Sequence, residues 1–158
     1  HLGTPLYVAC ENQQLKCAKK LLESGASANS GKDLDSPLHI AAQTSNVEMV
    51  HLLIDFGANT RAVNATTIDW NTPLFNACVS GSVDCLNLLL QHRASPHPVC
   101  DLASPIHEAA KRGASANSGK DLDSPLHIAA QTSNVEMVHL LIDFGANTRA
   151  VNAEGKSQ

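Results

Sequence analysis

The sequence predicts an all-α fold, a solenoid of stacked helix-turn-helix units. A tetrapeptide of Ser or Thr, Pro, Leu or Ile, and His or an aromatic residue occurs five times in the 158 residues. Its prolines are 32, 36, 32 and 20 residues apart, and recurrence every 20 to 50 residues or so is typical of repeat architectures. Because each unit of such an array touches only its neighbours, we expect function to lie on the stacked surface. The five copies begin at Thr4, Ser36, Thr72, Ser104 and Ser124.

Each copy of the motif is expected to open a helix. The Ser or Thr hydroxyl can accept a hydrogen bond from the free backbone amides, and Pro at the first helical position lacks the donor that would otherwise be unpaired. A second helix follows, with apolar residues three and four positions apart that predict one buried stripe. The clearest stripes are Val47, Val50, Leu53 and Ile54, and Val83, Leu86, Leu89 and Leu90.

The second helices are expected to end at glycines, which tolerate the left-handed conformation that closes a helix. Arg93 occupies this place in the third unit, so we expect a strained or differently shaped helix end there. The small polar residues that follow should form projecting turns, which we call fingers. The glycines concerned are Gly25, Gly57 and Gly145.

An apolar residue lies two positions before each motif, and in the third unit it is Trp70, where the other units have Leu. Trp70 either packs between neighbouring fingers or is an exposed interface anchor of the kind that aromatic residues often supply.

We expect a single domain over residues 1–158, with a truncated fourth unit. In that unit 8 residues separate Pro105 from Gly113, against 20 between the corresponding residues of the first, second and fifth units. Most of a second helix is therefore missing. We expect the flanking units to lack their packing partner and the fifth unit to fold poorly. The units span about 1–31, 32–66, 67–98, 99–118 and 119–153.

A second irregularity is an internal duplication. Residues 25–65 are identical to residues 113–153 at all 41 positions, whereas the other units share only framework residues. A recent duplication and a rearranged or engineered sequence both explain this identity. Either way, the two copies form an internal control with the same intrinsic propensities.

Composition argues against several functions. The net charge is -4 and no run of Lys or Arg exceeds two residues, so the basic footprint of a nucleic-acid binder is absent. No apolar run approaches the roughly 18 residues of a membrane span. Five cysteines include no C-x-x-C pair, and the recurrence of Cys10 with Cys78, and of Cys17 with Cys85, favours buried thiols over a disulfide or a metal site. Reduced thiols favour a cytoplasmic location.

No residue pattern favours catalysis. His39, His107 and His127 share a motif position with Tyr7 and Phe75, so we interpret them as structural hydrogen-bonding histidines and not as metal ligands. No nucleophile, zinc or phosphate-loop motif occurs. We therefore expect neither an enzyme nor a metal or other cofactor.

The arrangement S/T-P-L-H-x-A-A, a second helix, then G-A-x-x-N resembles the ankyrin repeat over nearly the whole chain. More narrowly, residues 69–82 (DWNTPLFNACVSGS), 102–110 and 1–7 resemble the ankyrin-repeat and SOCS-box family, although the units follow a different order here. The resemblance implies that the stack captures a substrate protein. A SOCS box then docks elongins B and C and cullin 5 for ubiquitin transfer. Residues 1–158 contain no Leu-Cys-Arg segment of the kind that begins that box, so we expect this stretch alone not to recruit the elongins.

The resemblance also implies which positions contact a partner. They are the finger residues just before each motif and the two residues after its Ala-Ala or Ala-Cys. Each taken alone is more often plain solvated surface, and the rival to the whole reading is a rearranged or engineered repeat scaffold without a selected partner. The candidate protein-binding residues are Lys32, Asp33, Asp35, Gln43, Thr44, Ile68, Asp69, Trp70, Asn71, Val79, Ser80, Asp101, Lys111, Arg112, Lys120, Asp121, Asp123, Gln131 and Thr132.

Overall fold

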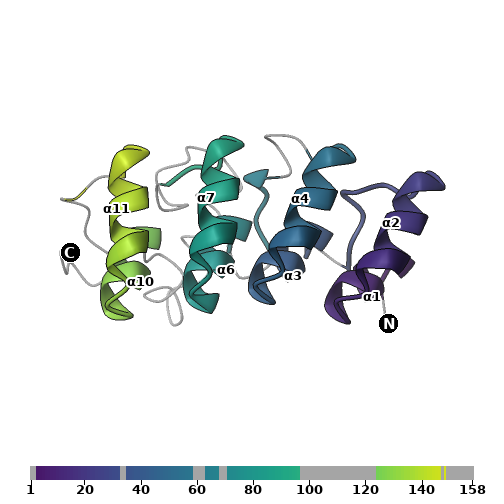
Figure 1. Ribbon diagram of the computed structural model, residues 1–158, viewed down its shortest axis with the longest axis horizontal. Coiled ribbons are helices and arrows are strands. Elements are labelled where there is room, and N and C mark those ends of the chain that lie inside the picture. The colour runs from purple at the N-terminus through teal and green to yellow at the C-terminus, as the bar shows by residue number, and fades with distance from the viewer. Residues whose placement is uncertain are drawn as a thin grey trace, which may run out of the picture.

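The computed structural model describes residues 3–32, 35–58, 63–67, 71–96, 124–146 and 148. In these residues eight helices form four pairs that follow one another in a row (Figure 1). The all-helical prediction is confirmed, since the only strand-like pairing in the described segments is an isolated bridge between Lys32 and Asp35. The helices are α1 (Pro5–Glu11), α2 (Leu15–Glu23), α3 (Pro37–Gln43), α4 (Val47–Asp55), α6 (Pro73–Ser80), α7 (Val83–Gln91), α10 (Pro125–Gln131) and α11 (Val135–Asp143).

The first helix of each described pair begins as the motif predicts. In α3 the Ser36 hydroxyl accepts from the amide of His39 at 3.3 Å, and the His39 ring in turn accepts from the amide of Ser36. Thr4, Thr72 and Ser124 accept in the same way at the starts of α1, α6 and α10. These contacts satisfy amides that would otherwise lack partners, so the local sequence sets the first residue of each helix.

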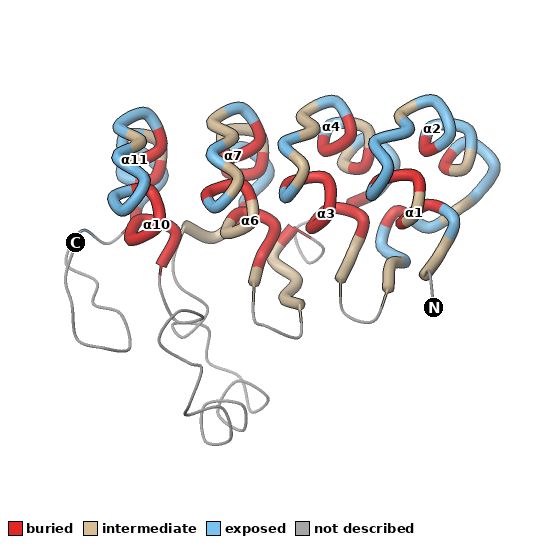
Figure 2. Tube along the Cα trace, turned by 90° about the horizontal axis from the view of Figure 1, so that it is seen from below, coloured by how far each residue is buried: buried red, intermediate tan, exposed pale blue. Residues whose placement is uncertain are grey.

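The helices form two layers. The first helices α1, α3, α6 and α10 pack side by side, and the second helices α2, α4, α7 and α11 pack in a second, parallel row against them. The core lies between the layers (Figure 2), where side chains such as Leu38, Met49, Leu53, Leu74 and Leu86 are fully buried. No described helix is long and apolar enough to cross a membrane.

The fifth unit has a packing partner, which corrects our expectation. We expected the interruption in the fourth unit to leave the fifth without a neighbour, but α10 packs on α6 and α11 packs on α7. The truncated unit itself, including Gly113, lies outside the described residues. The stack is therefore continuous from the third helix pair to the fifth unit.

The second helices end at left-handed residues. Gly25, Gly57 and Gly145 have φ values of 100°, 112° and 95°, as predicted. Arg93 has φ of 70° at the equivalent place, and its amide donates to Leu90 as that of Gly57 donates to Ile54. Arg93 thus keeps the shape of the glycine ends and bears the strain of a side chain in this region.

The prediction of buried thiols holds for three cysteines and is wrong for one. Cys10, Cys78 and Cys85 are buried, and burial raises the pKa of Cys10 and Cys78 to about 12 and also raises that of Cys85. Cys17 is exposed. The physical reason is position, because α4 packs against the α7 helix that carries Cys85, whereas α2 is the first helix of the second row and no described helix of that row packs on its other side. Cys100 lies outside the described residues.

Candidate protein-binding surface

One exposed side chain per unit stands at the end of each first helix. Gln43, Val79 and Gln131 each lie six residues after their motif proline, and all three are exposed, Val79 to 59%. Glu11 occupies the same place in the first unit and is also exposed. The prediction used the two positions that directly follow Ala-Ala or Ala-Cys. Ala9-Cys10 has this pattern and Glu11 follows it, so Glu11 was missed although its signal was in the sequence. We call Glu11, Gln43, Val79 and Gln131 the end row.

The residue after each end-row position is tied to the backbone instead. The hydroxyl of Thr44 donates to the carbonyl of Ile40 at 2.9 Å, and that of Thr132 donates to Ile128 at 3.1 Å. The Ser80 hydroxyl reaches the preceding unit and donates to the carbonyl of Ala42 at 3.0 Å. These three predicted contact residues therefore close helix ends or join units. Of the two predicted contact positions at the end of each first helix, the end-row position is thus the one whose side chain is exposed for contact.

The finger between the first two units is tightly built. Lys32 and Asp35 exchange two backbone hydrogen bonds, of 2.9 and 2.8 Å. A Cβ at Gly31 would overlap the carbonyl oxygen of Asp35, so only glycine fits there. The hydroxyl of Tyr7 donates to Oδ2 of Asp35 at 2.9 Å. Oδ1 of Asp35 is buried without a hydrogen-bond partner among the described atoms. The carboxylate of Asp35 is thus engaged by the stack itself.

The finger between the second and third units is held in place by residues of the second unit. The amide of Asn71 is bonded to the Thr67 hydroxyl, and the Thr67 amide donates to the carbonyl of Asn71 at 3.0 Å. Nε2 of His39 lies 2.9 Å from the carbonyl oxygen of Ala65 and 3.0 Å from that of Asn71. Asn71 is half-buried. Its backbone is therefore part of the framework, and only its side chain is available to a partner.

His39 is a structural residue, as predicted. Because Nε2 faces two carbonyl oxygens, it must carry the proton, and Nδ1 accepts from the amide of Ser36. Burial lowers the pKa of His39, an effect that the charge of nearby Asp35 opposes. Nδ1 of His127 accepts from Ser124 in the same manner, while His107 is outside the described residues. The described residues contain no cluster of His, Cys, Asp or Glu suited to a metal ion.

Several predicted contact residues fall in segments that the structure does not describe. The described ones lie at finger bases and at the ends of first helices. The candidates outside the described residues are Asp33, Ile68, Asp69, Trp70, Asp101, Lys111, Arg112, Lys120, Asp121 and Asp123.

Family models match most of the chain. A model described as "Ankyrin repeats (3 copies)" matches residues 6–100 and, in a second match, 38–117. A model described as "Ankyrin repeat" matches residues 121–153. Together the two models extend over every helix that the structure describes, except the start of α1.

Among known proteins, the chain is similar to ankyrin repeat and SOCS box proteins. It is 66% identical to protein 9 of this name from Homo sapiens over 65 residues, 41% of this chain and 22% of that protein. It is 49% identical to protein 5 from Bos taurus over 102 residues, 65% of this chain and 30% of the relative. It is 62% identical to protein 11 from Homo sapiens over 64 residues, 40% of this chain and 20% of the relative. The matched region thus spans less than a third of each relative.

Proposed function

The chain belongs to the ankyrin-repeat family, and on this premise we propose that it captures a substrate protein for ubiquitination, as the receptor part of an elongin B/C–cullin 5 ligase. Ankyrin repeats mark the chain as a protein-interaction module. The finer proposal rests on the relatives, whose names join such repeats to a SOCS box. Elongins and cullin 5 would be partners only of a full-length protein that includes this box.

The end row is the observation that supports substrate capture at this face. Its four side chains are exposed at the same repeat position in the first, second, third and fifth units. Val79 is an apolar side chain 59% exposed among polar neighbours, the composition expected at the centre of a binding patch. The row is continuous because the fifth unit stacks on the third, so its side chains form one surface.

Asp35, Thr44, Asn71, Ser80 and Thr132 support this surface in a different way. Their hydrogen bonds hold the fingers and helix ends in place. A rigid array of fingers lowers the entropy cost of ordering the interface on binding. We propose that Gln43, Val79 and Gln131 contact the substrate and that these other residues hold the surface in shape.

A crosslinking experiment tests the face. A photoreactive amino acid at position 79 should crosslink a partner in cell extract, and the same group at Gln91, exposed on α7, should not. The purified partner is then measured against the triple variant Gln43→Arg, Val79→Glu, Gln131→Arg. We expect affinity to fall at least about tenfold with unchanged helicity, as for loss of interface hot spots.

The control is the double variant Gln91→Glu, Glu136→Arg on the second-helix row, which should retain full affinity. Equal weakening by both variants, or crosslinks from position 91 only, would assign binding to another face. The ligase role is tested separately in the full-length protein with elongins B and C and cullin 5. The triple variant should keep elongin binding and lose transfer of ubiquitin to the partner. A full-length protein that binds no elongin would refute the ligase role and leave substrate capture standing.

A further inference from the structure

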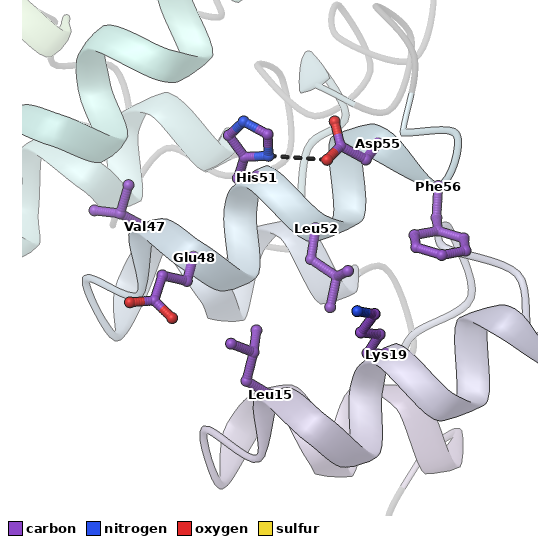
Figure 3. A pocket seen from close by; sticks show the side chains of 8 residues that line it. All are labelled: Leu15, Lys19, Val47, Glu48, His51, Leu52, Asp55 and Phe56. Atoms are coloured by element: carbon purple, nitrogen blue, oxygen red, sulfur yellow. Dashed lines mark hydrogen bonds and ion pairs between the residues drawn. The ribbon is translucent and has the colours of Figure 1, made fainter.

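A groove runs between α2 and α4 on the second-helix row, and no end-row residue lines it. One part has a volume of about 480 Å³ and is lined mainly by apolar groups, with Leu15 on α2, Val47 and Leu52 on α4, and Phe56 directly after α4 (Figure 3). Phe56 is 40% exposed. A second, more polar part continues toward the turns that contain Gln13, Ser45 and Asn46, and shares Leu15, Val47 and Glu48 with the first. Together they form one channel along both helices.

The α2 wall of this groove is basic. Lys19 extends into the apolar part, between Leu52 and Phe56 (Figure 3). No described carboxylate pairs with it, because the only ion pair in the described residues joins His51 to Asp55 at 3.0 Å. Lys16 and Lys20 are exposed on the same helix, whose one acidic residue is Glu23. The groove therefore combines an apolar floor with the ammonium group of Lys19, with which no described carboxylate pairs, while its α4 wall carries Glu48 and the Asp55 carboxylate that is bonded to His51.

We propose that this groove binds a short acidic segment of a partner protein, with an apolar side chain against Leu15 and Leu52 and an adjacent carboxylate on Lys19. The apolar floor supplies buried area, and peptide segments commonly place apolar side chains between two helices in this way. A carboxylate on the Lys19 ammonium would form a charge-assisted hydrogen bond. Glu48 lies toward the other end of the groove, near Leu15, so its repulsion disfavours an acidic side chain at that end, whereas near Phe56 the carboxylate of Asp55 points toward His51 (Figure 3).

The duplicated sequence supplies a matched comparison within the molecule. The α11 helix repeats the α4 wall residue for residue, with Leu140, Asp143 and Phe144 in place of Leu52, Asp55 and Phe56. The helix that faces it is α7, which has Val83 where α2 has Leu15, and Asn87 where α2 has Lys19. If Lys19 defines the site, the α7–α11 face should bind the acidic segment much more weakly.

The test follows amide chemical shifts of the isotope-labelled chain on addition of the peptide acetyl-Ser-Asp-Leu-Phe-Asp-Ser-amide. We expect shifts at Leu15, Lys19, Leu52 and Phe56 and none at Leu140 or Phe144. The peptide with Asn in place of both Asp residues should bind about fivefold to tenfold more weakly, and added salt should weaken the acidic peptide further. Lys19→Asn should have the same effect, and Asn87 shows that a second helix of this chain accepts Asn there.

The reciprocal variant makes the proposal falsifiable in both directions. Val83→Leu with Asn87→Lys gives α7 the two α2 side chains and should create peptide-induced shifts at Leu140 and Phe144. Equal binding of the acidic and amide peptides, or wild-type affinity in Lys19→Asn, would overturn the proposal. So would an absence of shifts at Leu15 and Leu52. Shifts confined to Gln43 and Val79 would also overturn it, and would leave substrate capture at the end row untouched.

Discussion

The helix pairs α3–α4 and α10–α11 have the same sequence and different surroundings. The first pair lies between α1–α2 and α6–α7, while the second packs on α6–α7 and is covered by no described residue on its other side. Val50 is fully buried, whereas its twin Val138 is only half-buried. Ile54 is half-buried and Ile142 is 44% exposed. The difference arises from packing alone, since propensity is identical.

Other corresponding residues of the two copies are equally buried, and this shows which face of the α10–α11 pair is uncovered. Met49 and Met137 are both fully buried, as are Leu53 and Leu141. These side chains pack within their own unit or against the preceding one, which both copies have. Each unit of the stack therefore has one face that its predecessor covers and one that only a following unit can cover.

The two ends of the described stack are unlike in this respect. In the first unit Lys20 occupies the place where Leu52, Leu88 and Leu140 pack against the core, and Cys17 nearby is exposed. This outer face is therefore polar. The outer face of α11, with Val135 exposed to 65%, is apolar. The comparison of the two copies is thus a comparison of a covered and an uncovered face.

Hydrogen exchange should show the largest difference between the copies. Uncovering Val138 and Ile142 forgoes about half of the 1.5 to 3 kcal/mol that burial of each such side chain supplies, or roughly 1.5 to 3 kcal/mol in total. Amides of residues 135–143 should therefore exchange about tenfold to a hundredfold faster than those of 47–55. Equal protection would mean that the outer face of α11 is covered in solution, which contradicts the comparison.

Truncation of one valine in each copy should separate the faces. Val50→Ala should lower the free energy of unfolding by about 2 kcal/mol because it removes two fully buried methyl groups, whereas Val138→Ala should cost less than about 1 kcal/mol. Urea unfolding of the two variants measures both values. Leu53→Ala and Leu141→Ala are the controls, and each should cost at least about 2 kcal/mol because both leucines are buried.

Substitutions at the left-handed helix ends should have equal effects in the two copies, because the strain that they introduce is local and does not depend on the neighbouring unit. Gly57→Arg and Gly145→Arg each place a side chain at a left-handed residue that has open space around it, so each should cost about 1 kcal/mol through local strain. Arg93→Gly should relieve the same strain and gain a similar amount. Thermal unfolding of the three variants checks this, and a clearly larger effect at Gly57 would show that stacking also controls the helix end.

These contrasts indicate what the sequence could predict. Helix starts at Ser36 or Thr72 depend on chemistry within four residues and were predicted. The alignment of Arg93 with glycines predicted a strained or differently shaped helix end, and the structure shows the strained, left-handed form. The exposure of Cys17 and the stacking of α10 on α6 depend on which unit lies next in space, which a periodic sequence does not specify. The end-row residue Glu11 was missed for a simpler reason, since its unit has the same Ala-Cys signal as the third.

The smallest expected effect is the pH dependence that His39 contributes. Its folded-state pKa is lowered from the ordinary 6.5 by burial, so the unfolded chain binds the proton more readily than the folded one. Stability from this residue is therefore fully present above about pH 6.5 and declines as the pH falls below that value. Urea unfolding at about pH 7.5 and about pH 5.5 should show the decline.

His39→Phe is the control, because Phe75 occupies the same motif position in the third unit. The variant should be less stable at both pH values, since Ser36 and the carbonyls of Ala65 and Asn71 lose a partner, but it should show a smaller difference between them. An unchanged difference would assign the pH dependence to other groups.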